Sequence, residues 1–578
     1  MRLLGICIVV SVLLASCAQK EMDPQKDKQF DAYKEWFVEA YWTIYPGYAS
    51  TVGYHKYDSV LIVPDAAARE HELNFCKAQL DSLNAYKPDE LSDNNRTDYL
   101  IIKNQLEGSI WSINEFRSWE WNPSQYNVSE TFAEMLNGTY DSLDNRLRNV
   151  YRKMAAVPAY YRAAVANIKN PTKEHTELAI EQNTGGVSVF EVDLVDALAK
   201  SRLPEEEKRQ ISERAVAAAT AMKDYAKWLQ ELKNDNPGNF RIGGELYRQK
   251  FKYDIQSGYT AEQIYEKALE RKQELHDNMY ELADTLWGRY MGKADRPHIK
   301  LQLIKDEIDT ISIMHTTPEK FQASIEQQIP VLVKFINEKN LIYLDPEKPL
   351  VVRKEPAYMA GVAGASITAP GPYDKGGNTY YNVGSLAGWE PERAESYLRE
   401  YNHYTLQILN IHEAIPGHYT QLIYSNQSPS IIKAIFGNGT MIEGWAVYTE
   451  LMMLENGYGN NEAEMWLMYY KWNLRSTCNA ILDYNVHVKN MSKEDAMDLL
   501  TKEAFQQNAE AEGKWRRATL TQVQLCSYFT GFTEICDLRA EVMERQGEKF
   551  DLRKFHEKFL SYGSAPVKYI KEMMLEEL

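Results

Sequence analysis

The chain has 578 residues, of which 44% are apolar and 25% are charged, as in an ordinary folded soluble protein. This length exceeds what one hydrophobic core usually serves, so we expect two lobes. The formal net charge of −17 argues against a nucleic-acid-binding function, because such proteins carry a basic face or stripe.

The N-terminus has the layout of an export signal that ends in a lipid-attachment site. Arg2 precedes an apolar run over residues 3–14, and residues 14–17 (Leu-Ala-Ser-Cys) resemble the lipobox of bacterial lipoproteins. We therefore expect a lipoprotein signal peptide over residues 1–16, lipidation of Cys17 and a polar tether over residues 17–24. The alternative is an ordinary signal peptide with an incidental cysteine.

Acyl chains on Cys17 would anchor the protein to a membrane without a spanning helix. No later segment is apolar for long enough to cross a bilayer. The tether resembles the acidic export signal of surface lipoproteins, so we expect an extracytoplasmic protein anchored to the outer membrane, facing either the periplasm or the exterior. The remaining cysteines show no close pair that would suggest a disulfide; they are Cys76, Cys478, Cys526 and Cys536.

Residues 25–240 read as an N-terminal helical lobe. One segment, from Leu203 to Lys233, has a proline near its start, an acidic first turn and periodic apolar positions, as helices do. Residues 234–243 contain Asn-Pro-Gly and read as a linker. We therefore place a second, catalytic lobe over residues 241–578.

The second lobe begins with helices over residues 259–340 and then changes character. Residues 341–383 carry short β-like runs broken by Gly and Pro, namely 341–344, 350–352 and 378–383. The last run either lies at a sheet edge and holds a substrate backbone by strand addition, or belongs to an ordinary small sheet. The glycine-rich segment 361–377 lacks a phosphate-loop signature and is a candidate mobile flap. A helix over residues 391–409 should follow.

The segment from His412 through Glu413 to His418 carries the clearest chemistry. Two imidazoles and a carboxylate form the ligand set of an open catalytic zinc site, and a glutamate directly after the first histidine is placed to act as general base. The histidines are six residues apart, about 120° around an ideal helix, so an unbroken helix would not let both reach one ion. Pro416 and Gly417 supply the break, and we expect a widened or bulged turn there.

The third zinc ligand should come from the next helix. Glu443 opens the apolar stretch Glu443-Gly444-Trp445-Ala446 and is our candidate. Glu450 lies seven residues later on the same helical face. It either holds a ligand histidine in place or is a solvated carboxylate.

These motifs, with SYFTG at 527–531, FDLRKFHEKFL at 550–560 and the Asp483-x-x-x-His487 element, resemble a bacterial family catalogued as domain of unknown function number 885. The resemblance is clear over residues 245–575. It implies a mainly α fold with a deep cleft between two helical lobes, a small β-sheet beside the metal helix, and chemistry similar to that of the gluzincin metallopeptidases.

The chain departs from the family pattern at two places. Gln522-Val523-Gln524 stands where the family usually has Pro-Gly-Gln, and Asn479 stands where it usually has an arginine. Neither change touches the metal ligands. Both affect substrate recognition, because an arginine near such a site would orient a substrate carboxylate or backbone.

The motifs together predict a zinc-dependent hydrolase, and we expect a metallopeptidase acting on a peptide or small amide. Zinc would be held by His412, His418 and Glu443, and Glu413 would accept the proton of the attacking water. Tyr528 and His487 are candidate donors to the developing oxyanion, or else a packed tyrosine and a capping histidine. Two alternatives stay open: a zinc hydrolase of a non-peptide amide or ester, such as an N-acyl amino acid, and a metal-binding surface protein without catalysis.

Overall fold

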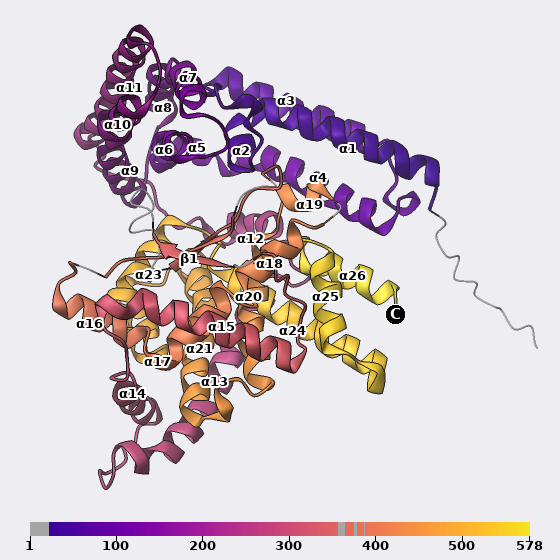
Figure 1. The fold of residues 1–578 in the computed structure, drawn as a ribbon, viewed down its shortest axis with the longest axis vertical. Coiled ribbons are helices and arrows are strands. Elements are labelled where there is room, and N and C mark those ends of the chain that lie inside the picture. The colour runs from indigo at the N-terminus through magenta and orange to yellow at the C-terminus, as the bar shows by residue number, and fades with distance from the viewer. Residues whose placement is uncertain (1–21, 349, 356–364, 375–377, 387, 429) are drawn as a thin grey trace, which may run out of the picture.

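The structure is a computed structural model that describes residues 22–348, 350–355, 365–374, 378–386, 388–428 and 430–578. It is mainly helical with one small sheet, as the sequence predicts. Helices α1 to α11 form the upper part of Figure 1 and most of the later helices form the lower part. Cys17, the signal peptide and most of the tether lie outside the described residues.

The helices of the first part are α1 (Pro24–Ile44), α2 (Pro46–Thr51), α3 (Ala66–Leu83), α4 (Asp93–Trp111), α5 (Ser118–Trp121), α6 (Ser129–Asn137), α7 (Leu143–Met154), α8 (Val157–Asn167), α9 (Lys173–Gly186), α10 (Leu194–Lys200) and α11 (Glu205–Glu231). Those that follow are α12 (Gly243–Asp254), α13 (Ala261–Tyr290), α14 (Lys300–Ile311), α15 (Phe321–Lys339), α16 (Pro391–Glu400), α17 (His403–Glu413), α18 (His418–Ser425), α19 (Ile431–Ile435), α20 (Gly439–Glu455), α21 (Ala463–Val488), α22 (Lys493–Asp498), α23 (Asn508–Leu520), α24 (Cys526–Gln546), α25 (Leu552–Ser561) and α26 (Val567–Glu576).

Two hydrophobic cores divide the molecule, but not at residue 240. One core takes buried residues from Tyr126 to Leu229. The other combines residues from Phe30 to Leu106 with residues from Phe240 to Met574. The first four helices therefore share a core with the second part of the chain, and the predicted division into residues 25–240 and 241–578 does not coincide with the division of the cores.

The sheet has three strands, β1 (Val351–Lys354), β2 (Ala365–Thr368) and β3 (Tyr380–Val383), in the order β1-β3-β2. Strand β3 pairs in parallel with β1 and antiparallel with β2. Because its backbone groups pair on both sides, β3 cannot accept a further strand, and its predicted use as a substrate rail at a sheet edge is wrong. The proposed flap over residues 361–377 lies partly outside the described residues.

Local signals explain where other elements begin and end. Helix α11 and the linker after it match the prediction, whereas the predicted helix over residues 391–409 is two helices, α16 and α17. Asn402 causes this division, because its side chain accepts hydrogen bonds from the backbone N–H groups of Tyr404 and Thr405 and thereby starts α17.

The run 341–344 is not a strand, since its backbone bonds to side chains of α25: the Leu341 carbonyl oxygen contacts the His556 ring and the Tyr343 N–H donates to Glu557.

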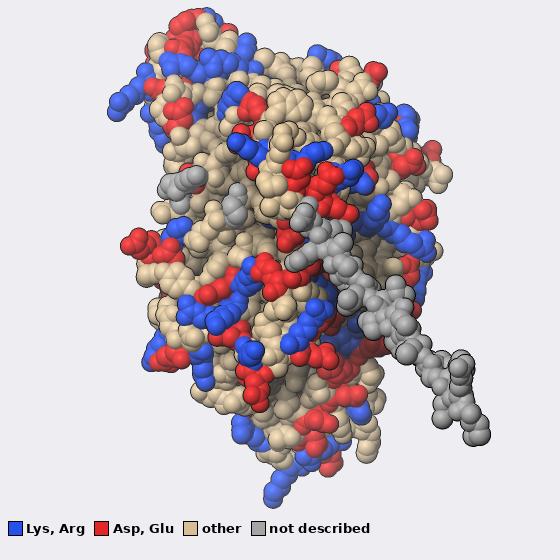
Figure 2. Space-filling model, turned by 90° about the vertical axis from the view of Figure 1, so that its right-hand side faces the viewer, with Lys and Arg blue, Asp and Glu red and all other residues tan. Residues whose placement is uncertain are grey.

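Surface charge is mixed on the face drawn in Figure 2, where basic and acidic side chains are interspersed. Among the described residues, no helix combines the length and apolar character that crossing a bilayer requires. The cysteines Cys76, Cys478, Cys526 and Cys536 are all free thiols.

Candidate metal centre

The two candidate ligand histidines, His412 and His418, lie on separate helices that meet at a tight turn. Helix α17 ends at Glu413 and α18 begins at His418, so the break predicted at Pro416-Gly417 is present and is complete. Gly417 donates its N–H to the Ile411 carbonyl oxygen at 2.9 Å. A Cβ on Gly417 would collide with the carbonyl oxygens of His412 and Ile411, so only glycine lets the chain return this closely.

The turn brings both imidazoles against Glu443 of helix α20. The Oε2 atom of Glu443 lies 3.4 Å from Nε2 of His418 and 3.8 Å from Nε2 of His412. The two rings are 4.8 Å apart and nearly perpendicular, at 88°. Three donor atoms from three helices thus converge on one point, although the sequence spreads them over 32 residues (412 to 443).

Glu450 fixes the orientation of His412. Its Oε1 atom accepts hydrogen bonds from Nδ1 of His412 at 2.7 Å and from the indole N–H of Trp472 at 2.9 Å. The Glu450 side chain is buried, which decides between the two readings of the sequence: it is a partner of the histidine and not a solvated carboxylate. Holding the proton on Nδ1 leaves Nε2 of His412 free to act as a ligand.

Burial governs the protonation of the cluster. Desolvation, with the nearby charge of His418, lowers the pKa of His412 to about 3, so this imidazole is neutral. Burial raises the pKa of Glu413 to about 7, which suits a group that must accept and return a proton near neutral pH. Burial alone would raise the pKa of Glu443, but the hydrogen bond from His418 and the electrostatic interactions with His418, His412 and Arg517 together outweigh it and lower that pKa.

Helix α20 can reach this position because it crosses α24 at two glycines. A Cβ on Gly531 would collide with the carbonyl oxygen of Thr440, and a Cβ on Gly444 would collide with the backbone of Gly531. Trp445 then donates its indole N–H to the Pro416 carbonyl oxygen at 2.9 Å and ties α20 to the turn between the histidines. The glycines of the EGWA and SYFTG motifs therefore set the distance between two helices.

Helix α25 packs against α20. Its Phe559 stacks on Trp445, with ring centroids 5.6 Å apart, and Nε2 of His556 lies 2.8 Å from the Tyr448 hydroxyl. The other ring nitrogen of His556 lies 2.8 Å from the Leu341 carbonyl oxygen. The FDLRKFHEKFL motif thus packs against the metal helix and contributes no ligand.

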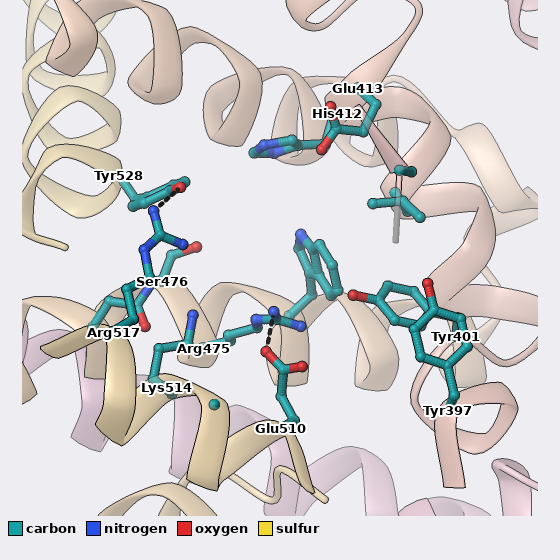
Figure 3. A pocket seen from close by; sticks show the side chains of 15 residues that line it. Tyr397, Tyr401, His412, Glu413, Arg475, Ser476, Glu510, Lys514, Arg517 and Tyr528 are labelled. Atoms are coloured by element: carbon teal, nitrogen blue, oxygen red, sulfur yellow. Dashed lines mark hydrogen bonds and ion pairs between the residues drawn. The ribbon is translucent and has the colours of Figure 1, made fainter. Parts of the chain in front are cut away.

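A cavity of about 360 Å³ opens beside His412 and Glu413, whereas His418 and Glu443 are not among its lining residues. Its lining residues all lie between Ala365 and Tyr528, within the second part of the chain and not between the two predicted lobes. Figure 3 shows His412 and Glu413 on one side, Tyr397 and Tyr401 on a second, and charged residues opposite His412 and Glu413. The full lining is Ala365, Tyr397, Tyr401, Leu409, His412, Glu413, Trp472, Arg475, Ser476, Asn479, Glu510, Gly513, Lys514, Arg517 and Tyr528.

The two candidate oxyanion donors have different positions. Tyr528 lines the cavity, and its hydroxyl oxygen accepts a hydrogen bond from Arg517 at 3.0 Å, so its own proton remains free to donate. His487 is buried away from the cavity lining, with Nε2 2.9 Å from the carbonyl oxygens of both Ala518 and Thr521. The placement of His487 contradicts its predicted catalytic role and makes it a support for the connection between α23 and α24.

Sequence reasoning missed the basic residues of the cavity, which are Arg475 on α21 and Lys514 and Arg517 on α23. A signal was available, because Glu510, Lys514 and Arg517 recur at i, i+4 and i+7 and therefore share one helical face. Arg475 lies one helical turn before Asn479. An arginine is thus still present in the cavity, one turn from the position where the family usually has it.

Comparison with known proteins now gives the family. A family model described as a bacterial protein of unknown function, DUF885, matches residues 46–574. The chain belongs to this family. The match begins well before residue 245, so helices of the first part belong to the family fold. A search of curated proteins finds no match.

Among the solved structures that resemble the chain, two cover nearly all of its length. One is described as a lipoprotein of unknown function from Shewanella oneidensis; it is 52% identical, with 94% of this chain and 99% of that chain covered and a TM-score of 0.87. The other is described as a lipoprotein from Colwellia psychrerythraea and shares the fold, with a TM-score of 0.77 at 16% identity over 96% of this chain and 100% of that one.

Proposed function

We propose that this protein is a zinc-dependent hydrolase, and specifically a metallopeptidase. The observation that carries the proposal is the convergence of His412, His418 and Glu443, with the Glu413 carboxylate beside them in a cavity. Glu413 also has a carboxylate oxygen within 4.8 Å of a ring nitrogen of each histidine. Glu443 lies closer, because its Oε2 atom is 3.4 Å from Nε2 of His418 and 3.8 Å from Nε2 of His412. We therefore assign Glu443 as ligand and Glu413 as base.

The residues fit a zinc ion in two respects. Ligands that share a tetrahedral zinc at about 2.0–2.1 Å lie roughly 3.4 Å from one another, close to the 3.4 and 3.8 Å contacts of Glu443. The imidazole of His412 is neutral and its second nitrogen faces Glu450, as a ligand histidine requires. Zinc, when bound, would polarise the scissile carbonyl and acidify the attacking water.

The side chains around this point supply the remaining chemistry. Glu413, with its pKa near 7, would accept the proton of the water and return it to the leaving nitrogen. Tyr528 has a free hydroxyl proton that could be donated to the developing oxyanion, and burial raises its pKa, which keeps that proton in place at neutral pH.

The test compares two variants that should fail differently. Glu413→Gln should keep zinc and lose about 10²- to 10⁴-fold in turnover, because an amide cannot accept the water proton. His418→Ala should lose the metal itself. Zinc content by plasma emission and cleavage of short peptides, free or blocked at each end, measure both effects.

Two outcomes would contradict the assignment. Loss of zinc from Glu413→Gln would make that residue a ligand, and full turnover by a zinc-replete Glu413→Gln protein would exclude it as the base. The same panel separates the alternatives: hydrolysis of N-acyl amino acids without peptide cleavage would indicate the non-peptide hydrolase, and no hydrolysis by the zinc-loaded protein would indicate a binding function.

We further propose that Cys17 is lipidated and anchors the protein outside the cytoplasm, at the outer membrane. The lipobox-like sequence and the lipoprotein description of the Shewanella relative support this. Cys17→Ser should shift the protein from the detergent phase to the aqueous phase in a partitioning assay.

A further inference from the structure

Three cationic side chains form one wall of the cavity, opposite His412 and Glu413 (Figure 3). We call Arg475, Lys514 and Arg517 the basic wall. Arg475 comes from α21, whereas Lys514 and Arg517 come from successive turns of α23. Because two helices contribute them and all three line the same cavity, their charges act on whatever occupies it.

The charges of the wall are only partly neutralised. Arg475 forms an ion pair with Glu510, and its Nη1 atom, which has no hydrogen-bond partner, lies 3.9 Å from the Glu400 carboxylate. Arg517 donates to two neutral groups, the side-chain oxygen of Gln524 at 2.6 Å and the Tyr528 hydroxyl at 3.0 Å. The Lys514 ammonium makes no ion pair or hydrogen bond within the described part of the chain, although the residue is only 5% exposed.

This arrangement is costly unless an anion joins it. Burying a cation without a partner carries a desolvation penalty, and like charges nearby add to it. Both causes act on Lys514, where burial and the charge of Arg475 lower the pKa to about 7. Groups whose protonation is perturbed by burial and by specific charges often gather at functional sites, and here the cavity beside His412 and Glu413 brings them together.

We propose that the basic wall binds a carboxylate of the substrate. With the carboxylate held at this wall, the bond to be cleaved would extend across the cavity towards the proposed metal ligands. Guanidinium groups suit this ligand because they match carboxylates geometrically and bind them with charge-assisted hydrogen bonds. This inference rests on the proposed hydrolytic function and adds a substrate class to it: acyl amino acids and peptides with a carboxylate one residue from the scissile bond.

The carboxylate could be the C-terminal α-carboxylate or the side chain of an acidic residue. The chemistry at the wall is the same for both. The α-carboxylate would make the enzyme remove residues from free C-termini, while a side-chain carboxylate would give specificity for Asp or Glu without a free terminus.

Binding to the Glu413→Gln protein tests the wall without relying on turnover. The probes, measured by calorimetry, are N-acetyl-phenylalanine and its amide, with N-acetyl-glutamate α-amide and N-acetyl-glutamine α-amide as the side-chain pair. A carboxylate should bind roughly ten- to a hundredfold more tightly than its matched amide. Preference within the first pair identifies the α-carboxylate as the source, and preference within the second identifies the side chain.

Lys514→Met and Arg517→Met, each added to Glu413→Gln, should reduce that preference to a few fold. The matched control is Arg516→Met, which removes a cation from the same helix where it pairs with Glu181 on the surface. Thermal unfolding verifies that each variant is folded, and replacing Lys514 with an apolar residue removes a buried charge and should not destabilise the protein.

Equal binding of acid and amide in both pairs would overturn the inference, as would an undiminished preference in both folded wall variants. These results are distinguishable from failure of the proposed function. A wild-type protein that prefers carboxylates but hydrolyses nothing would retain the basic wall and lose the hydrolase assignment. A wild-type protein that hydrolyses acids and amides equally would retain the hydrolase and lose the wall.

Discussion

The two sides of the cavity differ in how their residues are distributed along the chain. On the metal side, His412, Glu413 and His418 fall within seven residues and Glu443 follows on the next long helix. On the opposite side, Arg475 comes from α21, whereas Lys514 and Arg517 come from α23. The histidines and glutamates form a local sequence pattern that is typical of a metal site. The three cations form a cluster only because α21 and α23 come together in the fold.

Under the proposed function, the reaction class and the substrate class would be encoded differently in this chain. A metal site demands fixed residue types at fixed spacing, so it is visible in the sequence. A substrate carboxylate could be bound by any cation that the fold delivers to the cavity; here Arg475 lines the cavity one helical turn before Asn479.

The largest expected effect is a loss of turnover on substitution of Tyr528, in contrast to a loss of stability on substitution of His487. Tyr528→Phe removes the donated proton and should lower turnover about 10²- to 10³-fold, with zinc content and unfolding temperature unchanged. His487→Phe removes the contacts to two backbone carbonyl oxygens and should mainly destabilise the protein, by about 1–3 kcal/mol. A Tyr528→Phe protein with normal turnover would remove Tyr528 from the mechanism.

Gly531→Ala should push α20 away from α24 and displace Glu443. Because the new methyl group would collide with the Thr440 carbonyl oxygen, we expect a loss of about 3 kcal/mol in unfolding free energy together with weaker zinc binding. Gly288→Ala is the control, since its Cβ would meet nothing within 4 Å, and it should be neutral or stabilising by up to about 1 kcal/mol. Denaturant unfolding distinguishes them; equal behaviour would show that the crossing does not depend on glycine.

Glu450→Leu should weaken zinc binding about 10- to 100-fold, because His412 loses the carboxylate that orients it. The control is Glu455→Leu on the same helix, which removes a partly exposed carboxylate paired with Arg539. Competition with a zinc-binding dye measures both affinities. Unchanged affinity in Glu450→Leu would mean that the helix alone orients His412.

The smallest effect is a pH dependence of the carboxylate preference. Lys514 has its pKa lowered to about 7 and is surrounded by Arg475, Glu510, Arg517 and Glu400. Below pH 7 it is protonated and attracts a carboxylate; above pH 7 it is neutral, so the ratio of kcat/KM for an acid to that for its amide should fall, by about tenfold. The ratio cancels the titration of groups that act on both substrates.

Lys514→Arg provides the check on this pH dependence, because an arginine stays charged throughout the range. In this variant the ratio of kcat/KM for an acid to that for its amide should stay constant between pH 6 and pH 9. The same ratio is measured for the wild type over the same range. A ratio that falls equally in wild type and variant would assign the titration to another group.

Much of the fold and of the metal side could be predicted, for physical reasons. Helical periodicity identified α11, and the missing N–H of Pro416 with the small Gly417 predicted the break between the histidines. The rest depends on tertiary contacts. Nothing local shows that β3 is central, that α1 to α4 join the core of the later helices, or that His487 faces the carbonyl groups of Ala518 and Thr521.

X-ray absorption at the zinc edge of the zinc-loaded protein tests the central claim most directly. We expect one zinc per chain with nitrogen and oxygen ligands at about 2.0–2.1 Å and the outer-shell pattern of two imidazoles. In His412→Ala and His418→Ala the bound zinc should be lost or should retain the pattern of one imidazole. A spectrum with sulfur ligands, or one that neither substitution changes, would contradict the metal site and with it the proposed hydrolase.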